Sequence, residues 1–262
     1  MTIWDLNRLF KTPVHEETKS FRQPGLRAVF YEGLPHNGRP SKIFAWIGIP
    51  RTPKGKKIPA MVLVHGGGGT AFSNWVKLWN SRGYAAIAMD TCGGVPDKQN
   101  THDTNWTRHK HSGPSGWGNF DMSGEPPQEQ WPCHAVAAVI LGHSLLRSFD
   151  EVDTSRIGIT GVSWGGVLTC ITSGLDDRLA FAAPVYGCGF LGGDCVWNDG
   201  KSNNYEAWLR LWDPSIYLRW AKMPFLWLNG TNDTHFPIDS TMKSCALTKG
   251  EKRLSLRVRM HH

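Results

Sequence analysis

Hydrophobic residues gather in eight short segments rich in β-branched and aromatic side chains, separated by polar or glycine-containing stretches. The first two segments partly alternate apolar and polar positions, as in an antiparallel hairpin. Most later segments are continuously apolar, as in a parallel sheet covered on both faces. The predicted strands span residues 26–33, 42–50, 60–66, 85–90, 156–161, 180–187, 224–230 and 254–260.

Helical patterns lie between the later strands, at 72–83, 127–148, after Ser163 and at 238–250. Alternation of strands and helices predicts an α/β fold with a mostly parallel sheet and helices on both faces. Ligands of such folds bind at the carboxyl ends of the strands. The chain has 262 residues, without a visible repeat or boundary, so we expect one domain over residues 1–262.

One long stretch, residues 91–126, breaks the regular pattern. It is rich in Gly, Asn, His and Trp and follows the fourth predicted strand. Irregular segments of this length in compact domains are often functional. We therefore predict that it forms a pocket wall or a lid.

Composition narrows the range of partners. Hydrophobic residues make up 40% and charged residues 19% of the chain, as in globular proteins. The net charge is +7, but the 29 Lys and Arg residues are scattered, and the one tight cluster, at 53–57, is typical of a solvated hairpin. We therefore expect no nucleic acid partner.

The cysteines and the amino-terminal segment indicate the cellular compartment in which the protein is expected. The six cysteines contain no C-x-x-C pair, and only Cys188 and Cys195, in one glycine-rich loop, suggest a disulfide. The start lacks the features of a signal peptide, and no apolar run approaches about 18 residues. We expect a cytoplasmic chain with no membrane partner, or a secreted or periplasmic one if a signal peptide has been removed.

A candidate nucleophile lies in "GVSWG", residues 161–165, between a predicted strand and a predicted helix. A serine at such a corner matches G-x-S-x-G, in which glycines permit a sharp turn that exposes the hydroxyl. The helix that follows points N–H groups at negative charge developing there. Ser163 is thus predicted to attack a carbonyl; an ordinary helix-capping serine is the alternative.

A second motif, "VHGGGG" at residues 64–69, ends another buried strand. Glycines let backbone amides approach a substrate oxygen, so Gly67 and Gly68 are predicted to form an oxyanion hole with the N–H of Trp164. Nucleotide binding is disfavoured because G-x-G-x-x-G with its acidic partner is missing. His65 is expected to shape the loop.

The remaining triad members are sought after the last two strands, because the order Ser, Asp, His is typical of this architecture. Asp233 follows one of them and would orient a base, although it could merely shape a turn; Asp239 is the reserve. The base is predicted to be His262, with His261, or a histidine absent from this sequence, as alternatives.

Thirteen Trp residues suggest a carbohydrate ester, because indole rings stack on sugar faces. Trp106 and Trp117, in the long stretch, are predicted to contact substrate. Three histidines within residues 101–111 lack a recognisable ligand spacing, so we expect neither a metal nor a cofactor.

Taken together, the "VHGGGG", "GVSWGG", "NGTNDTHFP" and terminal "RVRMHH" motifs resemble the α/β-hydrolase superfamily, within it the acetylxylan esterase and dienelactone hydrolase-like group. The resemblance implies a Ser163, His262 and Asp233 triad. Dienelactone hydrolases use cysteine, so the serine favours an acetylesterase; a final helix typical of the group does not follow the last strand.

The expected function is therefore a serine carboxylesterase acting on short acyl esters, with acetylated saccharides such as xylan as the substrate class. A carbohydrate-binding relative without catalysis and a small serine peptidase are the alternatives. The sequence indicates no oligomeric state.

Overall fold

A computed structural model describes residues 3–96, 106–116, 120–198, 203–260 and 262. These residues contain a nine-stranded sheet with the order β1-β2-β3-β5-β4-β8-β9-β10-β11, and a separate pair, β6-β7. From β5 to β11 every neighbouring pair is parallel, whereas β1, β2, β3 and β5 pair antiparallel. The mostly parallel sheet of the sequence prediction is confirmed.

The strands of the main sheet are β1 (His15–Glu17), β2 (Arg27–Glu32), β3 (Lys42–Gly48), β4 (Ile58–Val64), β5 (Ala85–Met89), β8 (Val152–Val162), β9 (Phe181–Val185), β10 (Phe225–Gly230) and β11 (Lys252–Arg257). The small pair consists of β6 (Gly94–Pro96) and β7 (Trp106–Arg108). The helices are α1 (Leu6–Leu9), α2 (Ser73–Ser81), α3 (Trp131–Leu146), α4 (Trp164–Leu175), α5 (Asn203–Trp212), α6 (Ser215–Leu218) and α7 (Ile238–Leu247), with short 3-10 turns η1 (Phe120–Gly124) and η2 (Pro127–Glu129).

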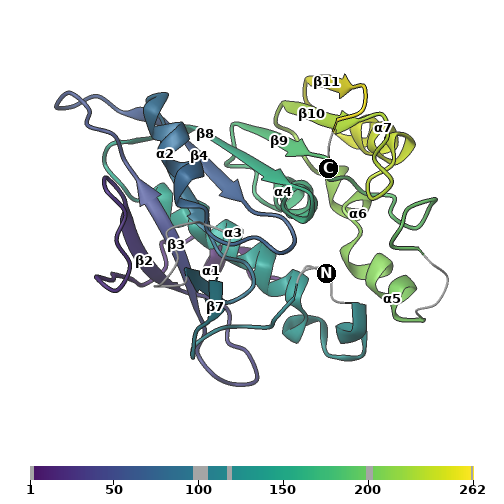
Figure 1. Cartoon of the computed structure of the whole chain (residues 1–262), viewed down its shortest axis with the longest axis horizontal. Coiled ribbons are helices and arrows are strands. Elements are labelled where there is room, and N and C mark those ends of the chain that lie inside the picture. Colours follow the sequence, from purple (N-terminus) through teal and green to yellow (C-terminus); the bar gives the residue numbers. More distant parts are fainter. Residues whose placement is uncertain (1–2, 97–105, 117–119, 199–202, 261) are drawn as a thin grey trace.

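Helices cover both faces of the sheet (Figure 1). In β4, Met61 and Leu63 pack in one core with Val76 of α2. The alternate residues Val62 and Val64 belong to the larger core that includes α3 and α4. This alternation follows from the two-residue period of a strand. Every residue of α3 is buried, which fits its nearly continuous apolar sequence.

All eight predicted strands are present, and β1 is the additional one. Its residues, His15 to Glu17, are all polar and exposed, so they lack the apolar alternation by which a strand is recognised. The pair β6-β7 lies in the 91–126 stretch, which was expected to be irregular. Helices α5 and α6 were not predicted either.

The described cysteines are all free, so the suggested disulfide between Cys188 and Cys195 is not formed. The thiol of Cys195 instead donates to the carbonyl of Leu191. No helix among the described residues is long and apolar enough to span a membrane.

Candidate active site

Ser163 alone forms the turn between β8, which ends at Val162, and α4, which begins at Trp164. Its φ of 57° lies in the left-handed region, a costly conformation for a residue with a side chain. A Cβ added to Gly161 would lie 2.1 Å from the Gly165 carbonyl oxygen, and one added to Gly165 would lie 2.1 Å from that of Val64. The two glycines are therefore required, because the backbones of β8, α4 and β4 pass in direct contact beside the serine.

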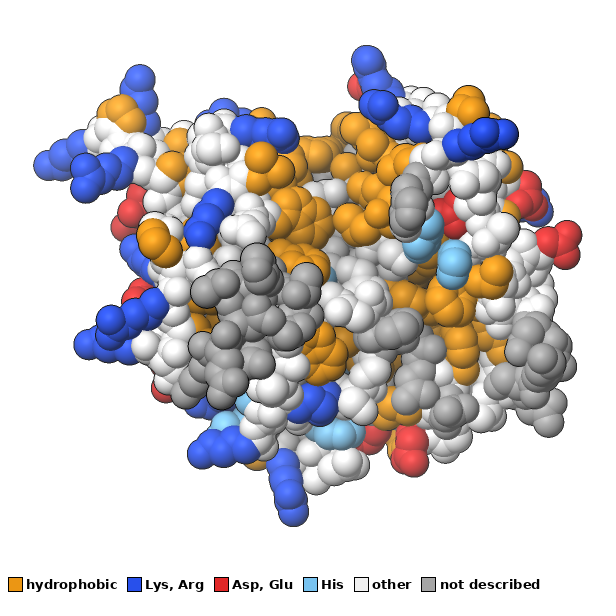
Figure 2. All heavy atoms as spheres, in the orientation of Figure 1, with side chains coloured by type: hydrophobic (Ala, Val, Ile, Leu, Met, Phe, Trp, Pro, Cys, Tyr) orange, Lys and Arg blue, Asp and Glu red, His pale blue; other side chains and the backbone are white. Residues whose placement is uncertain are grey.

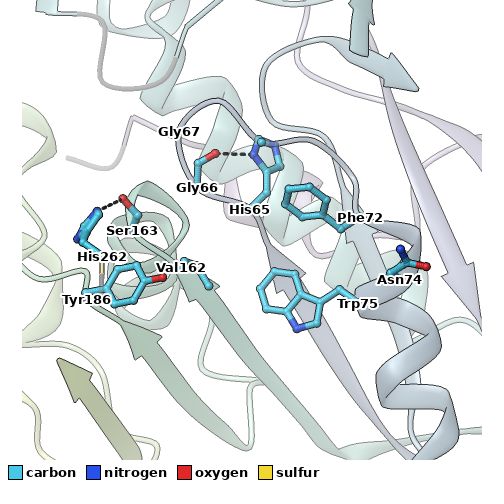
Figure 3. A pocket seen from close by; sticks show the side chains of 11 residues that line it. His65, Gly66, Gly67, Phe72, Asn74, Trp75, Val162, Ser163, Tyr186 and His262 are labelled. Atoms are coloured by element: carbon cyan, nitrogen blue, oxygen red, sulfur yellow. Dashed lines mark hydrogen bonds between the residues drawn. The ribbon is translucent and has the colours of Figure 1, made fainter. Parts of the chain in front are cut away.

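The structure brings Ser163, His262 and Asp233 together as a chain of hydrogen bonds (Figure 3 shows the first). The Ser163 Oγ lies 3.1 Å from His262 Nε2, and His262 Nδ1 lies 2.7 Å from an Asp233 carboxylate oxygen. With the proton on Nδ1 donated to Asp233, Nε2 is left to accept the serine proton. This is the arrangement that a serine nucleophile requires.

Asp233 is fixed from a second direction. Its other carboxylate oxygen accepts the backbone N–H groups of His235 and Phe236, both at 2.9 Å, and its side chain is 2% exposed. The reserve candidate Asp239 instead forms an exposed ion pair with Lys243 in α7. Asp233 is thus the carboxylate at the site, held so that one oxygen faces the imidazole.

Aromatic rings surround the His262 imidazole. The ring centroids of Tyr186, His235 and Phe236 lie 4.5, 4.6 and 5.7 Å from it. Burial and the nearby Asp233 carboxylate raise the pKa of the Tyr186 hydroxyl. Tyr186 is therefore uncharged at neutral pH and offers His262 a neutral face. The other predicted base, His261, lies outside the described residues.

The glycine-rich loop after β4 passes next to the serine. A Cβ on Gly66 would lie 2.7 Å from the Val162 carbonyl oxygen and 3.2 Å from the Ser163 Cβ. Gly67 lines the cavity at Ser163, while Gly68, with a φ of +70°, forms the turn beyond it. Trp164 is the first residue of α4, so its N–H has no acceptor within the helix. Its N–H and that of Gly67 are therefore candidates to hold an oxyanion.

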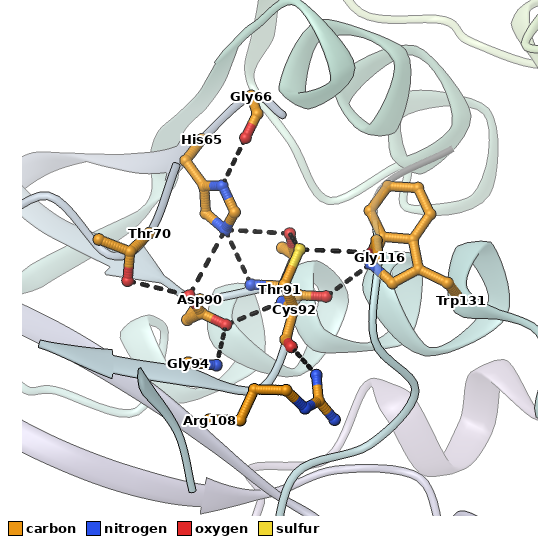
Figure 4. A network of polar contacts seen from close by, with 10 residues as sticks. All are labelled: His65, Gly66, Thr70, Asp90, Thr91, Cys92, Gly94, Arg108, Gly116 and Trp131. Atoms are coloured by element: carbon orange, nitrogen blue, oxygen red, sulfur yellow. Dashed lines mark hydrogen bonds and ion pairs between the residues drawn. The ribbon is translucent and has the colours of Figure 1, made fainter. Parts of the chain in front are cut away.

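His65 holds this loop in place through a buried network (Figure 4). Its Nδ1 donates to the Gly66 carbonyl at 2.8 Å, and its Nε2 accepts the N–H of Thr91 at 2.9 Å. Asp90 ties the same region together by accepting the Thr70 hydroxyl and the N–H groups of Cys92 and Gly94. The loop-shaping role expected of His65 agrees with these contacts.

A cavity of about 730 Å³ opens beside Ser163. Phe72 and Trp75, at the start of α2, face Tyr186 across it (Figure 3). Figure 2 shows hydrophobic side chains gathered in a hollow on this side of the molecule. The opening can therefore receive a group with apolar faces beside the serine hydroxyl.

The predicted substrate contacts are placed elsewhere or are not described. Trp106 lies in β7 against Gly94, outside the set of residues that line the cavity. Trp117 lies outside the described residues, and no described residue of the 91–126 stretch lines the cavity. Trp164 is buried in an aromatic cluster with Trp131, Trp197 and Trp208.

Trp75 lines the cavity but was not among the predicted substrate contacts. A signal was available: Trp75 follows the glycine-rich loop within a few residues. The first turn of a helix after such a loop lies at the carboxyl edge of the sheet, where ligands bind.

Comparison with known proteins now identifies the family. A sequence model described as acetyl xylan esterase (AXE1) matches residues 16–193, more than half of the chain and including Ser163. The chain belongs to the acetyl xylan esterase family. Membership makes it an ester hydrolase, and the predicted resemblance is confirmed.

Solved structures agree on the fold. An acetyl xylan esterase from a Paenibacillus species has a TM-score of 0.74 and 19% identity. The match covers 98% of this chain and 87% of that esterase chain. Acetyl xylan esterase 1 from a Thermoanaerobacterium species has a TM-score of 0.72 and 16% identity, with the same coverages. An acylaminoacyl peptidase from Pyrococcus horikoshii has a TM-score of 0.64 and 19% identity. The match covers 92% of this chain but 38% of the peptidase chain. The α/β-hydrolase fold is thereby confirmed.

Proposed function

We propose that this chain is a serine carboxylesterase that removes acetyl and other short acyl groups through Ser163, His262 and Asp233. The observation that carries the proposal is the unbroken hydrogen-bond chain from the serine hydroxyl to the buried carboxylate, at the mouth of an apolar cavity.

The geometry supports an acyl-enzyme mechanism. The Ser163 Oγ attacks the ester carbonyl as His262 Nε2 takes its proton, and the Asp233 carboxylate stabilises the imidazolium. The N–H groups of Trp164 and Gly67 receive the negative oxygen of the tetrahedral intermediate. His262 then protonates the departing alcohol, and a water molecule activated by the same imidazole releases the acid and restores the serine.

Acetylated saccharides of the xylan type are the proposed substrate class. Two structural relatives are described as acetyl xylan esterases, and the cavity wall formed by Phe72 and Trp75 offers flat apolar faces of the kind on which sugar rings stack. The hydrogen bond between Ser163 and His262 favours this proposal over a relative without catalysis.

The test compares the wild type with Ser163→Ala on nitrophenyl acetate and on acetylated xylo-oligosaccharides. We expect both activities to fall by a factor of about 10³ or more, since removal of a triad member typically has that effect. A Ser144→Ala variant is the matched control, because the Ser144 hydroxyl donates to the Leu9 carbonyl, away from the cavity. Equal activity in Ser163→Ala would refute the mechanism. Hydrolysis of nitrophenyl acetate without release of acetate from oligosaccharides would refute the substrate class alone.

A further inference from the structure

A second group of potential metal ligands lies apart from the triad. Ligand atoms of His36, Glu129 and His134 are all within 4.8 Å of one another. They come from three segments: the hairpin loop after β2, the η2 turn and the first turn of α3. None of the three lines the cavity at Ser163.

Two of the three side chains hold each other in position, and a backbone N–H group fixes one of them. Glu129 Oε2 accepts the His36 imidazole at 2.8 Å and the N–H of Asn37 at 2.9 Å. Asn37 and Gly38 both have positive φ, as in a tight hairpin turn closed by reciprocal hydrogen bonds between His36 and Arg39. The imidazole is therefore carried by a hydrogen-bonded turn, and the carboxylate is fixed against it.

His134 completes the group from the interior. Its side chain is buried, its Nε2 lies 2.9 Å from the Gln128 carbonyl oxygen, and its ring meets that of His36 edge to face, with centroids 5.4 Å apart. The three side chains thus approach one another from separate segments and supply two imidazoles and one carboxylate, a donor set that binds zinc.

We propose that His36, Glu129 and His134 bind one divalent transition metal ion of the zinc class, in which two imidazoles and one carboxylate leave a further position for water. Zinc bonds of about 2.0–2.2 Å to nitrogen and oxygen match this donor set. The ion takes the place of the proton in the hydrogen bond between His36 Nδ1 and Glu129 Oε2, and the Asn37 N–H acts as the outer contact that orients the carboxylate. Binding ties the β2–β3 loop to the start of α3.

The test is zinc titration of the full chain after removal of metals with EDTA. Calorimetry measures the binding, and the metal content of the protein is determined after dialysis. We expect one zinc to bind through this site and to raise the melting temperature by about 5 °C or more at saturating zinc. His36→Gln and Glu129→Gln each weaken that binding by about 100-fold and remove the thermal shift. Both positions are partly exposed, so the variants should fold, which their melting temperatures in EDTA verify.

The matched control is His235→Gln. Asp233, His235 and His262 form the other such group among the described residues, so zinc bound at the triad would depend on His235 instead. Zinc binding that survives in His36→Gln and Glu129→Gln but is lost in His235→Gln overturns the proposal. Lack of stoichiometric binding by the wild type overturns it as well. Loss in the first two variants with retention in His235→Gln supports it.

Discussion

The Oγ of Ser163 lies 3.1 Å from Nε2 of His262, although 99 positions separate the two residues in the sequence. The contact depends on parallel strands that deliver their carboxyl ends to one edge of the sheet. Ser163 follows β8, Asp233 follows β10, and His262 follows β11, which pairs with β10 in parallel. Because the three residues come from separate strand ends, each of them can be substituted and tested separately.

Asp233→Asn should lower kcat by a factor of about 10² to 10⁴ while the chain stays folded. A neutral amide no longer stabilises the imidazolium and no longer selects the tautomer with the proton on Nδ1. Steady-state kinetics on nitrophenyl acetate measure the effect. Asp239→Asn is the control, because Asp239 forms its exposed ion pair away from the site. A similar loss of activity in both variants would contradict the role given to Asp233.

Trp75→Ala should raise KM for aryl and sugar esters by about fivefold, the equivalent of roughly 1 kcal/mol of lost stacking, and should change kcat little. The indole lies on the cavity wall and not at the serine. Trp220→Ala removes an indole that is 63% exposed and does not line the cavity, so it should leave KM unchanged. If Trp75→Ala lowers kcat at constant KM, the ring acts in the transition state and does not bind the ground-state substrate.

Gly165→Ala should lower the free energy of unfolding by about 2–3 kcal/mol, or about 5–10 °C in melting temperature. The new methyl group would meet the Val64 carbonyl oxygen, which a strand in the sheet centre cannot withdraw. Gly124→Ala is the control, since a Cβ there meets no atom within 4 Å. Equal melting temperatures for the two variants would show that the crossing can relax.

The free energy of unfolding should fall as pH drops from 7 to 5, in part because of His109. Burial lowers the pKa of this ring to about 4, whereas an unfolded histidine titrates near 6.5. At pH 5 the unfolded chain therefore binds the extra proton, so stability is lost between about pH 6.5 and pH 4. Because the ring is partly exposed, we expect about 1 kcal/mol from this residue at pH 5.

Urea denaturation at pH 7 and pH 5 measures this contribution. His109→Gln should reduce the difference between the two pH values, and His15→Gln, a change on the exposed strand β1, should leave it as in the wild type. An identical pH dependence in wild type and His109→Gln would assign the loss to other groups.

The sequence predicted the strands that bury apolar residues, because burial imposes a pattern. It also predicted the Ser163 turn, because the crossing backbones admit only glycine around it. Strand β1 is exposed, and β6 and β7 have only three residues each, so none of them carries an apolar pattern long enough to recognise. The cavity wall at Trp75 depends on how α2 lies over the sheet, and the spacing of residues along one chain does not contain that orientation.

The backbone crossing at Gly161 and Gly165 limits how this enzyme can diversify. No side chain can be added beneath Ser163, so the turn that carries this proposed nucleophile cannot change gradually. New substrate preferences must arise in the surrounding segments that line the cavity, the start of α2 and the turn at Tyr186, where side chains can be exchanged without moving the serine. Substitutions at the two glycines are thus excluded by sterics, whereas substitutions along the cavity wall are the ones that change substrate preference.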